Sequence, residues 1–106
     1  MAFYLVTAKS KKNLLFELEQ KLSAKEFEPL KPFGYEVNKA LSKARWKDDE
    51  TAIWEENDYC IPPLAQERDA VLDTYFDDIE VEEVEKNKGW KKIDDLPFLF
   101  PKLNKK

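Results

Sequence analysis

The chain has 106 residues, of which 42% are hydrophobic, and this length fits one domain that can bury a core without disulfides. It contains no histidine and only two glycines, which excludes Ser-His-Asp triads, histidine-bound zinc and glycine-rich nucleotide loops, so we expect no metal and no cofactor. We expect a cytoplasmic protein for three reasons. The chain has one cysteine, it has no apolar run long enough to span a membrane, and its first residues do not form the apolar segment of a signal peptide.

The N-terminal third predicts a strand, a helix and a connector. An aliphatic and aromatic run over residues 3–8 is typical of a buried strand, and Ser10 is placed to cap the helix after it. Leucines recur at helical spacing over residues 14–22, which indicates an amphipathic helix. The segment 27–33 contains two prolines, so we expect an extended connector there.

The middle of the chain predicts a second helix, a strand and a third helix. Apolar residues at i, i+3, i+4 and i+7 favour a helix over residues 35–45. Side chains alternate in character along residues 51–56, which is typical of a strand with one face more exposed to solvent than the other. Pro62 and Pro63 suit a helix start, and apolar residues between positions 64 and 76 mark the buried side of that helix.

The last third predicts a strand over residues 79–84. Its alternation slips by one position at Glu82 and Glu83, which indicates a bulge. Residues 90–93 fit a further short strand. Residues 96–101 are too apolar for a solvated tail, so they either fold back on the core or reach across a dimer.

The order of elements is therefore strand, helix, helix, strand, helix and strand. Over a chain of 106 residues, this order predicts an α+β fold with helices packed on one face of a small, mostly antiparallel sheet of three or four strands. The order resembles that of ferredoxin-like domains, including those that pair into dimeric α/β barrels. We expect one domain over residues 1–95 and a C-terminal tail over residues 96–106.

Polar residues gather where the second strand is expected to lead into the third helix. Several carboxylates meet the backbone N–H groups of a helix start there, which allows two interpretations. The acids cap the helix and complement its dipole, or they line a small ligand pocket with aromatic walls. The pocket candidates are Trp54, Glu55, Glu56, Asp58, Tyr59, Cys60 and Arg68.

Arg68 is one of two arginines beside 16 lysines, and it lies four residues from both Leu64 and Leu72. This spacing predicts that Arg68 is more than half buried and either pairs with a carboxylate of residues 55–58 or anchors an anionic ligand. Cys60 has acidic neighbours and no histidine as a base, so we expect a small buried hydrophobe and not a nucleophile.

Charge is divided into three blocks: residues 48–85 carry 15 acids against one arginine, whereas residues 1–47 and 86–106 each sum to +5. Acids at this density need cations beside them. Those at the end of the third helix would meet lysines of the same chain, a basic partner or a divalent cation. The interaction candidates are Asp73, Asp77, Asp78, Leu96, Phe98, Leu99 and Phe100.

These patterns favour a cytoplasmic accessory or interaction protein whose acidic block docks on a basic surface or on the sister subunit. We expect the protein to be a homodimer. The alternative is a small enzyme or ligand-binding protein with a carboxylate-based pocket at residues 54–60 and Arg68. Because the chain has no histidine, acid–base catalysis would need a Glu or Asp whose pKa is raised by burial. The sequence leaves open whether the chain is an enzyme. The acidic block disfavours nucleic acid as a partner, and no membrane contact is expected.

Overall fold

The computed structural model of the chain describes residues 2–58 and 64–104. Its sheet has four antiparallel strands in the order β2-β3-β1-β4. Tyr59, Cys60 and the expected helix start at Pro62 and Pro63 lie outside the described residues. The strands are β1 (Ala2–Ser10), β2 (Arg45–Trp46), β3 (Thr51–Asp58) and β4 (Phe76–Val84).

The helical segments fall into three groups along the chain. The first group lies between β1 and β2, the second leads into β4, and the third follows β4. They are η1 (Lys12–Leu14), α1 (Leu15–Ser23), α2 (Gly34–Ser42), α3 (Ala65–Glu67), the π-helical η2 (Arg68–Leu72), α4 (Asp73–Tyr75), α5 (Lys88–Lys92) and η3 (Pro101–Asn104). In the described part of the chain, none of these helices is long and apolar enough to cross a bilayer.

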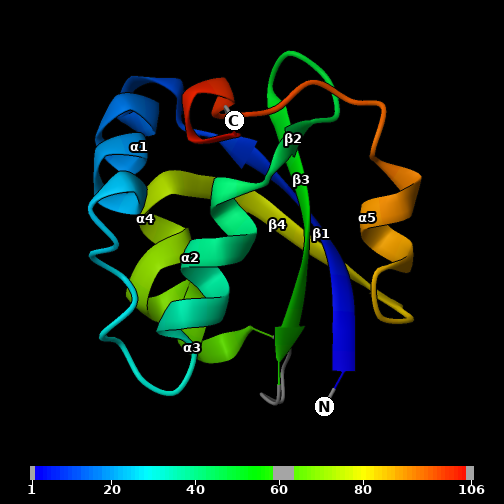
Figure 1. Ribbon diagram of the computed structural model, residues 1–106, viewed down its shortest axis with the longest axis horizontal. Helices are drawn as coiled ribbons and strands as arrows, with labels where there is room; N and C mark the ends of the chain where they lie inside the picture. The colour runs from blue at the N-terminus through cyan, green and yellow to red at the C-terminus, as the bar shows by residue number, and fades with distance from the viewer. Residues whose placement is uncertain (1, 59–63, 105–106) are drawn as a thin grey trace.

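Figure 1 shows α1 to α4 on one side of the sheet and α5 on the other. The predicted class, an α+β fold with a small antiparallel sheet, is confirmed. The prediction that the helices share one face is wrong for α5. The finer resemblance to ferredoxin-like domains stays a prediction.

Alternating side chains of β1 and β3 divide the interior into two cores. On the side of α1 to α4, Trp54 is fully buried and its ring centroid lies 5.1 Å from that of Phe76. On the side of α5, Leu5, Ile53 and Ile93 form a smaller core. Both faces of the sheet are therefore covered, and the smaller core requires α5.

The element α5 replaces the short strand that the pattern predicts over residues 90–93. A five-residue helix has little stability of its own, so its conformation depends on contacts with the rest of the fold. Those contacts come from β1 and β3. The prediction was wrong because its evidence was purely local.

The bulge in β4 lies at Asp78 and not at Glu82–Glu83. The register between β4 and β1 shifts there by one residue, and Asp78 adopts a φ of 52°, which aspartate tolerates better than most residues. The extra residue lets Phe76 and Ile79 both contact the larger core although they are three residues apart.

Ser10 ends β1 and does not cap the following helix. Its N–H donates to the carbonyl of Glu50 at 2.9 Å, and no side chain caps η1. The predicted cap was wrong because the strand continues two residues beyond Ala8, to Ser10.

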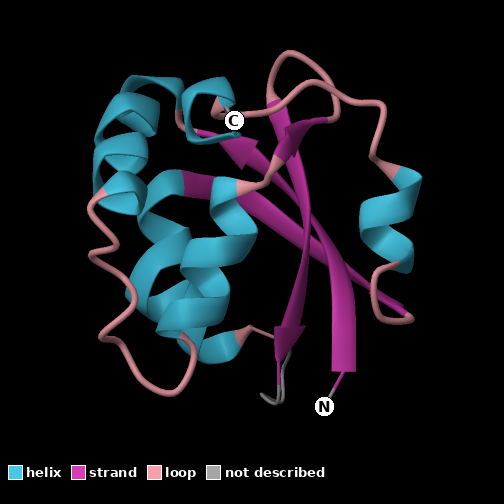
Figure 2. Cartoon of the chain, in the orientation of Figure 1, coloured by secondary structure: helices cyan, strands magenta, loops and turns pink. Residues whose placement is uncertain are grey.

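The connector between α1 and α2 is an irregular loop (Figure 2) that packs closely on the start of α2. A Cβ atom at Gly34 would lie 2.0 Å from the carbonyl oxygen of Phe27, so only glycine fits this position. The two predicted helices are present on either side of it, and α2 ends three residues earlier than the pattern predicts.

Residues 96–104 fold back on their own chain, which is the first of the two expected alternatives. The N–H of Leu99 donates to the carbonyl of Ala44 at 2.8 Å, and Leu99 and Phe100 belong to the larger core. Phe98 bridges to Arg45, and Leu96 packs against the smaller core.

Candidate functional site

The predicted pocket residues on β3 are buried but point to opposite faces of the sheet. Trp54 and Glu56 face α1 to α4, whereas Glu55 faces α5. Trp54 is part of the larger core and is not a pocket wall. The sequence therefore located the right strand, but consecutive side chains of a strand point to opposite faces of the sheet.

Glu55 holds the start of α5. Its Oε1 accepts the N–H of Gly89 at 2.8 Å and that of Trp90 at 3.3 Å, and its Oε2 accepts the N–H of Asn87 at 2.9 Å. These are the donors that a helix start leaves without partners. The capping interpretation thus holds for Glu55, but on a helix that the sequence did not predict.

Glu56 is a buried carboxyl group with only one hydrogen-bonded oxygen. Its Oε1 accepts the indole N–H of Trp54 at 2.9 Å, and its Oε2 is buried and has no partner among residues 2–58 and 64–104. Burial, together with the nearby charges of Glu67 and Asp58, raises the pKa of Glu56 to about 8, although the Trp54 bond opposes the shift. Glu56 is therefore largely protonated at neutral pH.

Asp58 and Glu67 form a second acidic contact beside Glu56. Asp58 Oδ2 accepts the N–H of Leu64, which ties the end of β3 to the start of α3. Glu67 is 1% exposed, and burial raises its pKa to about 7, helped by the charge of Asp58 and a hydrogen bond to it. Three acids therefore gather in the protein interior, and the sequence signalled two of them.

Arg68 does not join this cluster. It lies on the exposed side of the helical stretch, with 46% of its side chain exposed, and its Nε is 3.7 Å from Asp73 Oδ1. The prediction of a pair with residues 55–58 was wrong. The wider π-helical turn of η2 changes the phase of the helix, so that Glu67, and not Arg68, faces the core with Leu64 and Leu72.

One edge of β3 borders a groove. Among the described strands, β2 alone pairs with this edge, and only at Ala52 and Ile53. Beyond them a groove of about 740 Å³ extends between α2 and α5, and both Glu55 and Glu56 line it. Because these two side chains point to opposite faces, this space, which we call the edge groove, wraps around the strand. Its volume lies within the range of small-molecule sites.

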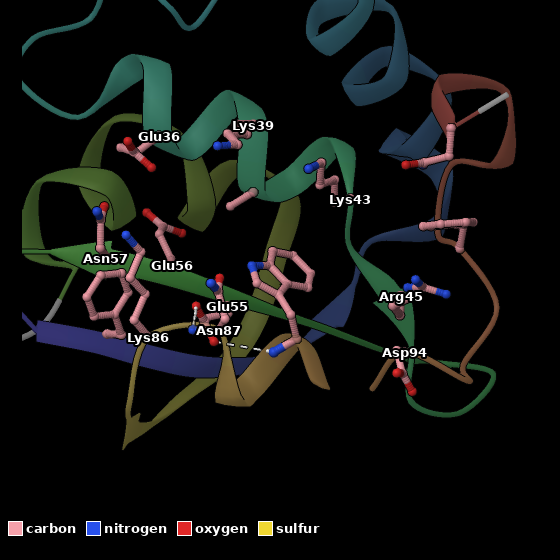
Figure 3. A pocket seen from close by; sticks show the side chains of 15 residues that line it. Glu36, Lys39, Lys43, Arg45, Glu55, Glu56, Asn57, Lys86, Asn87 and Asp94 are labelled. Carbon is pink, nitrogen blue, oxygen red and sulfur yellow. Dashed lines mark hydrogen bonds between the residues drawn. The ribbon is translucent and has the colours of Figure 1, made fainter. Parts of the chain in front are cut away.

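The edge groove is bordered by four cations (Figure 3). Lys39 comes from α2, Lys43 directly follows that helix, Arg45 comes from β2, and Lys86 comes from the turn before α5. In the part of the chain that the structure describes, none of the three lysines has a carboxylate within ion-pair distance. Their charges are therefore available to a ligand.

The acids of the edge groove do not balance these cations. Glu55 is used by α5, and Glu56 is largely neutral because of its burial. Glu36, Glu55 and Asp94 remain against four cations, because hydrogen bonds from N–H groups do not remove the charge of a carboxylate, and the excess of positive charge is small. The groove is therefore cationic near neutral pH, although it lies against the acidic central block. Its apolar lining includes the rings of Phe3, Trp90 and Phe98.

Sequence reasoning missed the cations of the edge groove. Lys39 and Lys43 are four residues apart and therefore on one helix face, which alone indicates only a solvated surface. Arg45 lies two residues after Lys43 at the expected end of the second helix, where a cation suits the helix dipole and indicates no further role. What turns these residues into a site is the approach of α5, which the pattern did not predict.

The interaction candidates are partly paired within the chain. Lys9 lies 3.7 Å from Asp78, and Lys11 lies 3.8 Å from Asp77. Lys11 also donates to the backbone carbonyl of Asp73 at 3.0 Å. Three kinds of cation were expected beside these acids: lysines of the same chain, a basic partner or a divalent cation. The structure shows lysines of residues 1–47 beside them.

Within residues 2–58 and 64–104, no group of three or more His, Cys, Asp or Glu side chains has an arrangement that holds a metal ion. Comparisons with family models, with curated proteins and with solved structures gave no match.

Proposed function

We propose that this protein binds a small organic anion in the edge groove. The observation that carries the proposal is the set of three lysines, Lys39, Lys43 and Lys86, that surround one concave space and have no acidic partner in the described part of the chain. The aromatic lining of the groove supports a ligand with an apolar body.

Glu56 is the residue of the groove that could act in catalysis. A carboxyl group with a pKa of about 8 holds a proton that it can donate near neutral pH, which is the acid–base role that a chain without histidine needs. Proton transfer to or from the bound anion is therefore the activity that the groove supports best, with Glu56 as the acid. Binding itself does not depend on this step.

The test is a titration followed by tryptophan fluorescence, because Trp90 borders the groove. Octanoate is expected to give a saturable change, and octanamide, which has the same apolar chain without the charge, a much weaker one. The double variant Lys39→Ala/Lys43→Ala should bind octanoate about fivefold more weakly, as expected for the loss of two exposed charge contacts.

The matched control is Lys12→Ala/Lys31→Ala, which removes the same charge from exposed positions outside the groove. It should leave octanoate affinity unchanged. Equal binding of octanamide, or equal weakening by the two double variants, would contradict the proposal.

A second candidate function is docking of the acidic block on a basic partner. It is favoured by β4, which pairs with β1 on one edge only and forms the outer strand of the sheet. The exposed acids of β4 and the residue after it are Asp77, Asp78, Glu80, Glu82, Glu83 and Glu85.

Docking predicts a partner that is captured from a cell extract at low salt and lost at high salt. The homodimer belongs to this candidate. Sedimentation at micromolar concentration should then give about twice the chain mass of 12.5 kDa at low salt and the single-chain mass at high salt. A single-chain mass in both conditions would remove the dimer. A cytoplasmic setting is part of both proposals and is supported by the single cysteine.

A further inference from the structure

Within the described part of the chain, two buried donors without partners border the edge groove, one from each face of the sheet. The first is Glu56. The indole N–H of Trp54 can only donate, so Oε1 must accept it, and the proton of the neutral carboxyl group is on Oε2, which has no partner. The second donor is the Nε–H of Arg45, which is also buried without a partner.

Arg45 is held in place by its other contacts. Its Nη1 donates to the carbonyl of Leu96 at 2.6 Å, and its guanidinium lies 3.8 Å from the ring centroid of Phe98. A buried donor without an acceptor destabilises the free protein, which makes an acceptor oxygen from a ligand favourable at each position.

The two donors are well separated. Arg45 pairs with Ile53, and Glu56 lies three residues further along β3, so the two strand positions are about 10 Å apart. Figure 3 shows Arg45 at the right and Glu56 left of the centre, with Lys39 of α2 and Lys43, which directly follows α2, above the space between them. A single carboxylate cannot reach both ends.

We infer that the ligand is an elongated dicarboxylate, with one carboxylate at Arg45 and Lys43 and the other at Glu56 and Lys39. Its apolar middle lies against the aromatic lining, and it crosses the open edge of β3 between the two faces of the sheet. This inference rests on the proposed function and specifies its ligand class.

The experiment compares three probes with the full chain by calorimetry. Suberate has two carboxylates on a chain of about the required length, octanoate has the same number of carbons and one carboxylate, and succinate has two carboxylates on a short chain. Suberate is expected to bind about tenfold more tightly than either, because only it satisfies both donors.

Variants assign the two ends. Arg45→Gln should lower suberate affinity to about that of octanoate and change octanoate affinity little. Glu56→Ala should also remove the suberate preference, whereas Glu56→Gln retains an N–H donor and should keep most of it. The comparison of probes on the unaltered protein remains decisive if a variant fails to fold.

Equal affinity for suberate and octanoate would overturn the dicarboxylate and leave the anion groove standing. Equal affinity for suberate and succinate would overturn the end-to-end arrangement. Absence of binding by all three probes would overturn the proposed function together with this inference.

Discussion

Glu56 is the residue with the least ordinary environment in the described chain. It is 3% exposed, it has an unpartnered oxygen, and its acidic neighbours disfavour its charged form. Because its pKa rises from an ordinary 4.5 to about 8 on folding, the folded state binds its proton more tightly than the unfolded state does. This contribution to stability is complete below the unfolded pKa and is lost as the pH rises towards the folded pKa.

The free energy of unfolding is therefore expected to fall between pH 5.5 and 8, by up to about 1.4 kcal/mol per pH unit from Glu56. Glu67, whose pKa is raised to about 7, adds a slope of the same sign below pH 7. Glu56→Gln should therefore remove only the part that Glu56 contributes, which is most of the slope between pH 7 and 8, and urea unfolding at a series of pH values measures it. The matched control, Glu80→Gln on the exposed face of β4, should keep the slope. Stability of the unaltered protein that rises over this range would show that Glu56 is ionised in the fold.

Arg68 supports a contrasting prediction. Its exposed contact with Asp73 is worth about 0.5 kcal/mol or less, so Arg68→Ala should change the free energy of unfolding very little. A buried pair, as the spacing to Leu64 and Leu72 predicted, would cost about 3 kcal/mol or more when broken. Chemical denaturation separates the two values, and a large loss would restore the sequence-based assignment.

At the scale of elements, α5 depends on a carboxylate that is distant in the chain. Glu55→Ala removes the acceptor for three N–H groups and should destabilise the protein by about 3 kcal/mol, with hydrogen exchange of Gly89 and Trp90 accelerated most. Glu55→Gln keeps one acceptor oxygen and should recover part of the loss. Unchanged exchange at these two residues in Glu55→Ala would mean that α5 forms without the cap.

The C-terminal segment is predicted to stabilise the single chain. Leu99 is 6% exposed, so Leu99→Ala should lower the free energy of unfolding by about 3 kcal/mol at any protein concentration. The control, Leu30→Ala, removes a side chain of the same type at an exposed position and should cost far less. A loss that depended on protein concentration would instead place this segment in a dimer interface.

Elements with local evidence could be predicted from the sequence, and elements with distant partners could not. The strands β1, β3 and β4 and the helices α1 and α2 follow from apolar spacing, because each buries one face of a regular element. The helix α5 takes its cap from a residue 34 positions before Gly89. The face of Arg68 depended on a π-helical turn that no spacing rule predicts.

The sequence identified some residues of the candidate site and missed others. Glu56 and Asp58 were identified because acids at the end of a strand are conspicuous. Glu67 was missed because the expected helix phase placed Arg68 in its position. The lysines of the edge groove were missed because the groove exists only when α2, β3 and α5 come together.

At the scale of the molecule, the three charge blocks of the sequence do not form three surfaces. Lys9 and Lys11 of the first block pair with Asp78 and Asp77 of the central block, while Lys39 and Lys43 of the same first block lie at the edge groove with Lys86 of the last. The fold thus leaves a cationic groove at one edge of the sheet and an acidic strand, β4, at the other. The two proposals are therefore compatible in one small domain, since an organic anion and a basic partner would be attracted to different places.

The most direct test of the anion groove is a ¹H–¹⁵N spectrum of the protein titrated with suberate. We expect saturable shifts that are largest at the Nε–H of Arg45, the backbone of Lys39 and Asn87, and the indole N–H of Trp90, all of which border the edge groove. The residues of β4 should not move. Shifts that centre on β4, or that grow without saturation and follow the ionic strength alone, would contradict a ligand site between α2 and α5.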